Sequence, residues 1–142
     1  MPRRRWDVVY YRTADDAVPA DDFLDACPPK VAAQLVAVID DVAEAPPPRY
    51  SGGGRWEAMH GRMGGFYEVR AQGPKREQFR LFCILENGTP AELRRRGLVR
   101  PAMALITGMR KPWMTAFSER EYAAVRRMAD DHRSRFPRRI RE

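Results

Sequence analysis

The segment 78–85 constrains the fold of this chain most strongly, because it is a nearly continuous apolar run. Such a run is typical of a central strand whose two faces are both covered. Arg80 interrupts it, and a charge at that place must be paired or face a hydrated cavity, since burying it alone is costly. The run therefore predicts a sheet with packing on both faces and a functional reason for one arginine.

The residues before this run predict one strand and two helices. The segment 6–11 is β-branched and aromatic, as in a first strand. Asp21 and Asp22 suit the first turn of a short helix, which Pro28 and Pro29 end before a longer helix begins. Prolines 46–48 end the second helix. Its apolar residues recur at helical spacing: Val31, Leu35, Val38, Ile39 and Val42.

The later residues predict a sheet and a final helix. The glycine-rich segment 49–55 reads as a mobile loop, followed by strands at 56–60, 66–71, 78–85 and 102–107. Ser118 and Glu121 have the spacing of a capping box, which starts the last helix. The apolar stripe of that helix is Tyr122, Val125, Met128, Ala129 and His132. The expected fold is one α+β domain over residues 1–142: an N-terminal strand, a two-helix hairpin, an antiparallel sheet of four to five strands and a C-terminal helix, with loose ends at 1–4 and 135–142.

Composition limits the classes of partner, metal site and cellular location that we expect. The 142 residues carry a formal charge of +7 and a pI near 10.0, which favours a polyanionic partner. Cys27 and Cys83 lie among apolar neighbours and are expected to be reduced core residues. The cysteines and the two histidines lack the spacing of zinc ligands, so a structural zinc site is not expected. No cofactor is expected either. No segment has the ~18 apolar residues of a membrane span, and no signal peptide is recognised, so we expect a cytoplasmic protein.

Three strand-like stretches each carry a cation: Arg70, Arg80, and the pair Arg110 and Lys111. If these stretches are neighbours in a sheet, their charges can converge on one face and bind phosphate or stabilise a phosphoryl transition state. The sequence does not decide which of Arg110 and Lys111 points inward.

The segments 66–70 (FYEVR), 79–82 (FRLF) and 107–112 (TGMRKP) resemble, in this order, the RelE/ParE superfamily of toxins from type II toxin-antitoxin systems, and within it the HigB-like, phage-derived branch. The resemblance implies a RelE-like fold and a ribosome-dependent mRNA endoribonuclease, neutralised by a cognate antitoxin that often has a helix-turn-helix. It implies metal-independent attack of a ribose 2′-OH on the adjacent phosphate. Arg70, Arg80 and Arg110 would form the phosphate clamp, with Lys111 as a second candidate beside Arg110.

Other residues are candidates for supporting roles. His60 would serve as general acid or base, or else be a rim histidine without a catalytic role. The remaining expected RNA-binding residues are Arg62, Arg94, Arg95, Arg96 and Trp113. Trp113 would stack on an unpaired base or pack in a loop, and the run 94–96 would grip RNA, receive the antitoxin or be merely solvated. Two other functions stay open: action on DNA gyrase by a superfamily relative, and RNA binding without catalysis by a phage protein.

Overall fold

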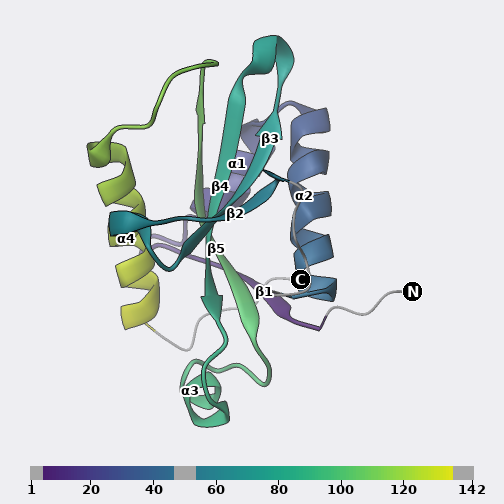
Figure 1. The fold of residues 1–142 in the computed structure, drawn as a ribbon. Helices are drawn as coiled ribbons and strands as arrows, with labels where there is room; N and C mark the ends of the chain where they lie inside the picture. The colour runs from purple at the N-terminus through teal and green to yellow at the C-terminus, as the bar shows by residue number, and fades with distance from the viewer. Residues whose placement is uncertain (1–4, 47–53, 136–142) are drawn as a thin grey trace.

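The computed structural model describes residues 5–46 and 54–135, which form an α+β fold (Figure 1). The expected N-terminal strand, two consecutive helices, further strands and C-terminal helix are all confirmed. The elements are β1 (Asp7–Tyr10), α1 (Pro19–Ala26), α2 (Pro29–Glu44), β2 (Trp56–Ala58), β3 (Phe66–Gln72), β4 (Gln78–Glu86), α3 (Pro90–Arg95), β5 (Ala102–Lys111) and α4 (Glu119–Ser134), with short 3-10 turns η2 (Gly61–Met63) and η3 (Pro74–Arg76).

The five strands form one sheet in the order β1-β5-β4-β3-β2. Strands β2 to β5 pair antiparallel, but β1 pairs parallel with β5, from Asp7 opposite Ala102 to Tyr10 opposite Leu105. The expected antiparallel sheet is therefore wrong at β1. The partner of β1 is β5, the last strand of the described chain and not the next one, so no hairpin turn imposes the antiparallel direction on this pair.

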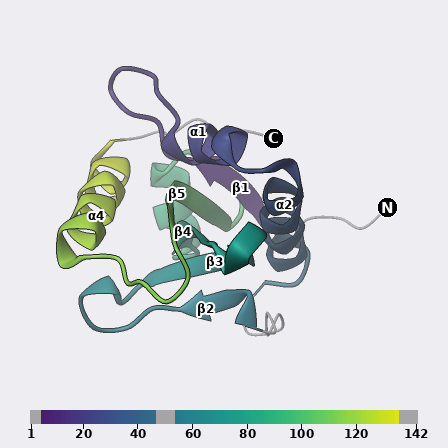
Figure 2. The same cartoon turned by 90° about the horizontal axis from the view of Figure 1, so that it is seen from above.

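Helices cover both faces of the sheet, and Figure 2 shows α1 and α2 on one side and α4 on the other. On the first face, Leu35 of α2 belongs to one hydrophobic core with Leu81 and Leu105 of the sheet. On the second, Val125 of α4 belongs to another core with Phe82. The prediction of a central strand covered on both faces is confirmed, since β4 supplies side chains to both cores.

The start of α4 is fixed as its sequence predicts. The Ser118 hydroxyl accepts a hydrogen bond from the backbone N–H of Glu121 at 3.1 Å, and the Glu121 carboxylate accepts one from the Ser118 N–H at 2.8 Å. This reciprocal capping satisfies two donors that a helix start leaves free. It therefore fixes where α4 begins.

A helix, α3, stands where the sequence suggested only a basic excursion. Thr89 and Glu92 form a second capping box, and Pro90 occupies the first turn, where its missing N–H costs nothing. Figure 1 shows α3 at the opposite end of the sheet from the β3–β4 turn. The ladder from Gln78 to Glu86 separates these ends by about 27 Å at 3.4 Å per residue.

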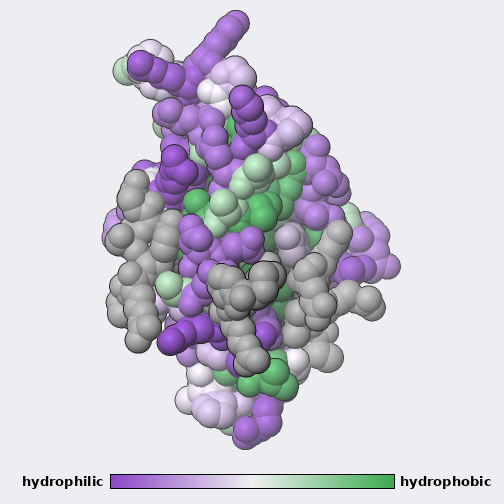
Figure 3. All heavy atoms as spheres, turned by 90° about the vertical axis from the view of Figure 1, so that its right-hand side faces the viewer, coloured by the Kyte–Doolittle hydropathy of each residue, from purple (hydrophilic) through white to green (hydrophobic). Residues whose placement is uncertain are grey.

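Several terminal and loop predictions lie outside the described residues, namely 1–4, 49–53 of the expected loop, and 136–142. Arg135 is described, and it is not loose: its guanidinium donates to Asp131 and, at 3.2 Å, to the carbonyl of Arg12. Within the described ranges, no helix is both long and apolar enough to cross a bilayer. On the side of the molecule that carries α2, hydrophobic atoms are visible near the centre and again at the lower end, among mostly hydrophilic atoms (Figure 3).

Candidate functional site: a cationic cluster on the α4 face

Alternation along β3 and β4 brings Arg70 and Arg80 to the same face of the sheet. The two residues are opposite one another in the ladder. Their neighbours Val69 and Leu81 point into the core under α1 and α2, so the arginines point to the α4 side. Two cations in direct cross-strand contact repel each other, and they need a compensating group.

Glu68 is that compensating group. It is 7 % exposed, its Oε1 accepts a hydrogen bond from Nε of Arg70 at 2.7 Å, and the same oxygen forms an ion pair with Nη2 of Arg70 at 2.6 Å. The same oxygen lies 3.8 Å from Nε of Arg80. One buried carboxylate thus holds two guanidinium groups in place and leaves the cluster with a net positive charge.

Arg80 is the most enclosed of the cluster's cations. Its guanidinium donates to the side-chain oxygen of Gln78 at 2.7 Å and to the carbonyl of Phe79 at 3.1 Å. Burial lowers the pKa of Arg80, and the charge of Glu68 opposes this effect. The expectation that this charge is paired or faces a hydrated cavity is confirmed, because Arg80 is paired with Glu68 and also lines a polar pocket. Its hydrogen bonds fix the plane of the guanidinium, as a phosphate-binding fork requires.

A β-bulge decides which residue of the pair 110–111 joins the cluster. The ladder between β4 and β5 shifts register at Phe82 and Cys83, which lie opposite Thr107 and Leu105. Strict alternation from the start of β5 would send Arg110 to the α4 face. The extra residue in the bulge reverses the phase, so Lys111 points there instead.

Arg110 lies on the opposite face of the sheet, so it does not join Arg70 and Arg80 as the sequence predicted for the phosphate clamp. Its guanidinium stacks over the Phe79 ring at 4.6 Å and forms two hydrogen bonds to the Glu77 carboxylate, at 2.7 and 2.9 Å. Phe79 belongs to the core under α1 and α2. The structure therefore separates Arg110 from Arg70 and Arg80.

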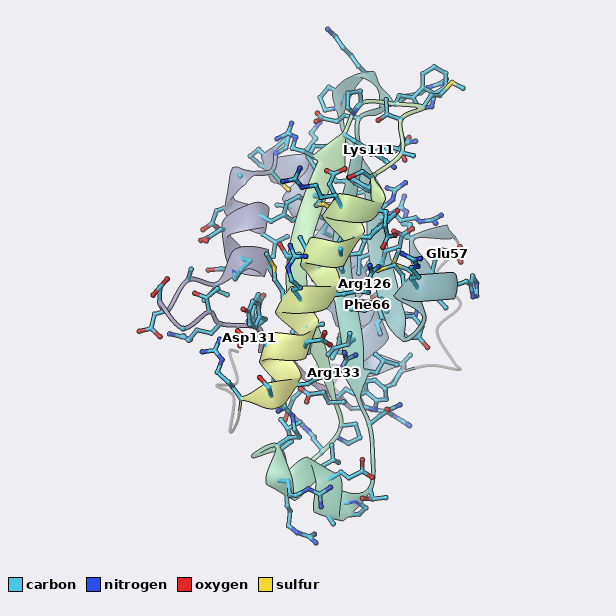
Figure 4. All side chains as sticks on the ribbon, turned by 90° about the vertical axis from the view of Figure 1, so that its left-hand side faces the viewer. Glu57, Phe66, Lys111, Arg126, Asp131 and Arg133 are labelled. Carbon is cyan, nitrogen blue, oxygen red and sulfur yellow. The ribbon has the colours of Figure 1, made fainter. Side chains whose placement is uncertain are left out.

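Lys111 completes the cluster from β5. Its ammonium lies 4.0 Å from the centre of the Phe117 ring, and Figure 4 shows the residue beside the N-terminal end of α4. Burial lowers the pKa of Lys111, the nearby charge of Arg80 lowers it further, and Glu68 opposes both. The mutual influence of these three groups indicates that they share one electrostatic environment.

Tyr122 of α4 faces the same cluster, although the sequence placed it only on an apolar stripe. Burial raises the pKa of its phenol, as does the charge of Glu68, while Arg80 opposes the rise. The ring packs edge-on against Phe82 and Phe117, at 6.1 and 5.9 Å between centroids. The Tyr122 hydroxyl is therefore protonated at neutral pH, and its raised pKa makes it a weaker acid than an ordinary tyrosine.

A polar pocket of about 490 Å³ opens beside the two arginines. It lies at the edge of β3, beyond the point where β2 stops pairing. Its lining consists of Gln34, Gly54, Arg55, Arg70, Ala71, Gln72 and Arg80. Both arginines of the cluster line this pocket, together with Gln34 of α2.

Two candidates from the β2–β3 connection lie apart from the cluster's centre. Met59 pairs with Phe66, so its neighbour His60 stands at least four strand residues, about 13 Å, from Arg70 along β3. His60 is exposed at the start of η2. Arg62 is also exposed and forms an ion pair with Glu119 at 3.6 Å. Neither position supports a direct role in catalysis, and Arg62 remains a surface cation.

The three arginines at 94–96 divide into two groups. Arg94 and Arg95 are exposed on α3. Arg96 instead donates to Glu86 at 2.6 Å and to the carbonyl of His132 at 3.0 Å, which ties it to the end of α4. This placement gives Arg96 a structural role and leaves Arg94 and Arg95 as surface cations far from the cluster.

Glu86 is the centre of this second, structural network. Besides Arg96, it contacts Nε2 of His132 at 3.0 Å, and His132 is fully buried. Burial raises the pKa of Glu86, but the hydrogen bonds from His132 and Arg96 outweigh it, so the net pKa is lowered. The network anchors the C-terminal end of α4, while the capping box fixes its start.

Comparison with protein-family models, with curated proteins and with solved structures gave no match. The proposal below therefore depends on the site and on the sequence resemblance.

Cys27 and Cys83 are free and buried, as expected for core thiols.

Proposed function

We propose that this chain is a toxin of the RelE/ParE superfamily, from its HigB-like branch, that cleaves mRNA on the ribosome. The observation that carries the proposal is the convergence of Arg70, Arg80 and Lys111, from three adjacent strands, on one side of the sheet. The sequence resemblance supplies the reaction, and the cluster supplies the groups that such a reaction needs.

In the proposed reaction, a ribose 2′-OH attacks the adjacent phosphate, giving a cyclic phosphate and a free 5′-OH. Negative charge grows on the phosphate oxygens, where Arg70 and Arg80 offer planar forks and Lys111 a point charge. Glu68 holds both arginines in orientation before the substrate arrives. Tyr122, which is protonated at neutral pH, donates its proton to the departing 5′ oxygen, and the proton released by the attacking 2′-OH passes to solvent water, from which the phenol is reprotonated. The resemblance implies chemistry without a metal.

The proposed partners follow from the same interpretation. The ribosome and its mRNA would contact the surface cations Arg62, Arg94 and Arg95, which give affinity through counterion release and need no exact positioning. A cognate antitoxin, of the helix-turn-helix type that accompanies many such toxins, would neutralise the activity. The site of action would be the cytoplasm.

A translation reaction tests this proposal. Purified protein is added to ribosomes translating a defined mRNA, with Arg80→Ala as the inactive control. Discrete mRNA fragments, seen only with wild-type protein, support the proposal. If the mRNA stays intact and the protein inhibits DNA gyrase in a separate assay, the protein acts as the gyrase-directed relatives do. If the mRNA stays intact and the protein binds RNA in a salt-sensitive manner, it is a non-catalytic RNA-binding protein.

A further inference from the structure

The β3–β4 turn and the β5–α4 connection lie side by side at one end of the sheet, because Gln78 and Lys111 are opposite one another in the ladder. Each segment contributes one side chain to a cation–π contact at this end of the sheet. Arg76 comes from the first and Trp113 from the second, and the guanidinium of Arg76 lies 4.7 Å from the centre of the indole. The indole remains 49 % exposed.

The backbone of both segments is held in conformations that most residues avoid. Lys75, Arg76 and Met114 have φ values of 57°, 60° and 62°. Of the four non-glycine residues with positive φ in the described part of the chain, these are three. Such conformations persist only where surrounding contacts impose them, and they concentrate at ligand sites.

A tight turn presents the indole. The N–H of Thr115 donates to the carbonyl of Pro112 at 3.3 Å, and the Thr115 hydroxyl donates to the same oxygen at 2.7 Å. Trp113 occupies the outer corner of this turn, with Met114 in the left-handed region, as in a type II turn. Arg76 then covers part of the indole and restricts its rotation.

The position of Trp113 relates it to the cationic cluster. Consecutive Cα atoms are 3.80 Å apart, so the Cα atoms of Lys111 and Trp113 are separated by at most about 7 Å. A phosphate at Lys111 and a base at Trp113 can therefore belong to the same nucleotide or to adjacent ones.

We propose that Trp113, backed by Arg76, is a stacking platform for an unpaired base of single-stranded RNA next to the scissile phosphate. An exposed aromatic ring among cations is the feature that single-stranded nucleic acids recognise, and a paired base in a duplex has no free face to offer. The inference rests on the proposed function, and it names the substrate as single-stranded. It makes Trp113 a substrate-positioning residue.

The test measures RNA binding by the full-length protein, without ribosomes or cleavage. The probe is a fluorescein-labelled single-stranded oligoribonucleotide, followed by fluorescence anisotropy at fixed salt, with the same strand annealed to its complement as a second probe. Variants are Trp113→Ala, Trp113→Phe and Trp113→Leu. Met114→Ala is the matched control, since Met114 is 78 % exposed in the same turn but has no ring.

We expect Trp113→Ala to weaken single-strand binding about tenfold, within the range measured for loss of one stacked base. Trp113→Phe should retain most of the affinity, Trp113→Leu should not, and Met114→Ala should match wild type. Duplex binding should be equal in all variants. Affinity of Trp113→Ala within about twofold of wild type, equal affinity of the Phe and Leu variants, or no binding of single strands by wild type would overturn the proposal.

These outcomes are distinguishable from those of the cleavage test. Stacking at Trp113 without mRNA cleavage would refute the proposed enzyme and keep the platform. Cleavage with unchanged binding by Trp113→Ala would refute the platform and keep the enzyme.

Discussion

The sharpest prediction for the cationic cluster compares alanine substitutions at two adjacent residues, Arg110 and Lys111. Lys111→Ala removes a charge from the α4 face, whereas Arg110→Ala removes one from the opposite face, so the two variants have the same net charge. We expect the first to lose most cleavage activity and the second to retain it. Any account based on total charge alone predicts equal effects.

The expected size follows from the position of Lys111. A unit charge at about 4 Å from a phosphate, at the effective dielectric constant of about 20 found near protein surfaces, interacts with about 4 kcal/mol. Only the part that grows in the transition state accelerates the reaction, and loss of one such group costs about 10²-fold to 10³-fold in rate. We therefore expect Lys111→Ala to slow cleavage about 10²-fold, and Arg110→Ala to stay within about twofold because its partners Glu77 and Phe79 lie on the other face.

The assay is single-turnover cleavage of ribosome-bound mRNA at saturating protein, with circular dichroism melting as a control for folding. Lys111→Arg should restore most of the rate. Because the pKa of Lys111 is lowered, its charge is lost at a lower pH than that of an ordinary lysine, so the wild-type rate should decline early on the alkaline side. Lys111→Arg should move that decline to higher pH. Equal losses in Lys111→Ala and Arg110→Ala would refute the assignment of faces.

Three further predictions concern the groups that hold the site in place. Glu68→Gln should destabilise the fold by about 2 kcal/mol, measured by urea unfolding, because it removes charged hydrogen bonds from a buried position. Arg96→Ala should cost about 3 kcal/mol, because it leaves the buried Glu86 without the arginine of its two partners. Since the pKa of Glu86 is lowered in the folded state, its contribution to stability is present at neutral pH and is lost as the pH falls through the lowered folded-state pKa, and Glu86→Gln should remove this acid dependence. Gly108→Ala should cost about 1 to 3 kcal/mol in thermal melting, because an added Cβ would lie 2.1 Å from the Phe23 ring. A loss below about 0.5 kcal/mol in Glu68→Gln, Arg96→Ala or Gly108→Ala would contradict the corresponding contact, and an unchanged acid dependence in Glu86→Gln would contradict the role given to Glu86.

The sequence predicted the parts of the fold that depend on local pattern. Helical periodicity located α2, reciprocal capping located the start of α4, and the apolar run 78–85 identified the central strand. Arg70 and Arg80 were found for the same reason, since alternation in adjacent strands fixes which face they share.

What the sequence missed depends on pairing between distant segments. The bulge opposite Phe82 and Cys83 reverses the phase of β5 and replaces Arg110 by Lys111, and no local pattern marks it. Tyr122 reaches the cluster only because α4 packs across the sheet. The helix α3 is different, because its signal was present in the spacing of Thr89 and Glu92 and was outweighed by the arginines that follow.

The central claim is that this chain cuts RNA by attack of a 2′-OH within the cluster of Arg70, Arg80 and Lys111. The most direct measurement maps the mRNA ends produced in a translation reaction by wild-type protein and by Arg80→Ala. The account predicts fragments with cyclic phosphate and 5′-OH ends for wild type, and intact mRNA for a folded Arg80→Ala variant. Intact mRNA with wild-type protein, fragments with 5′-phosphate ends, or undiminished cleavage by Arg80→Ala would contradict it.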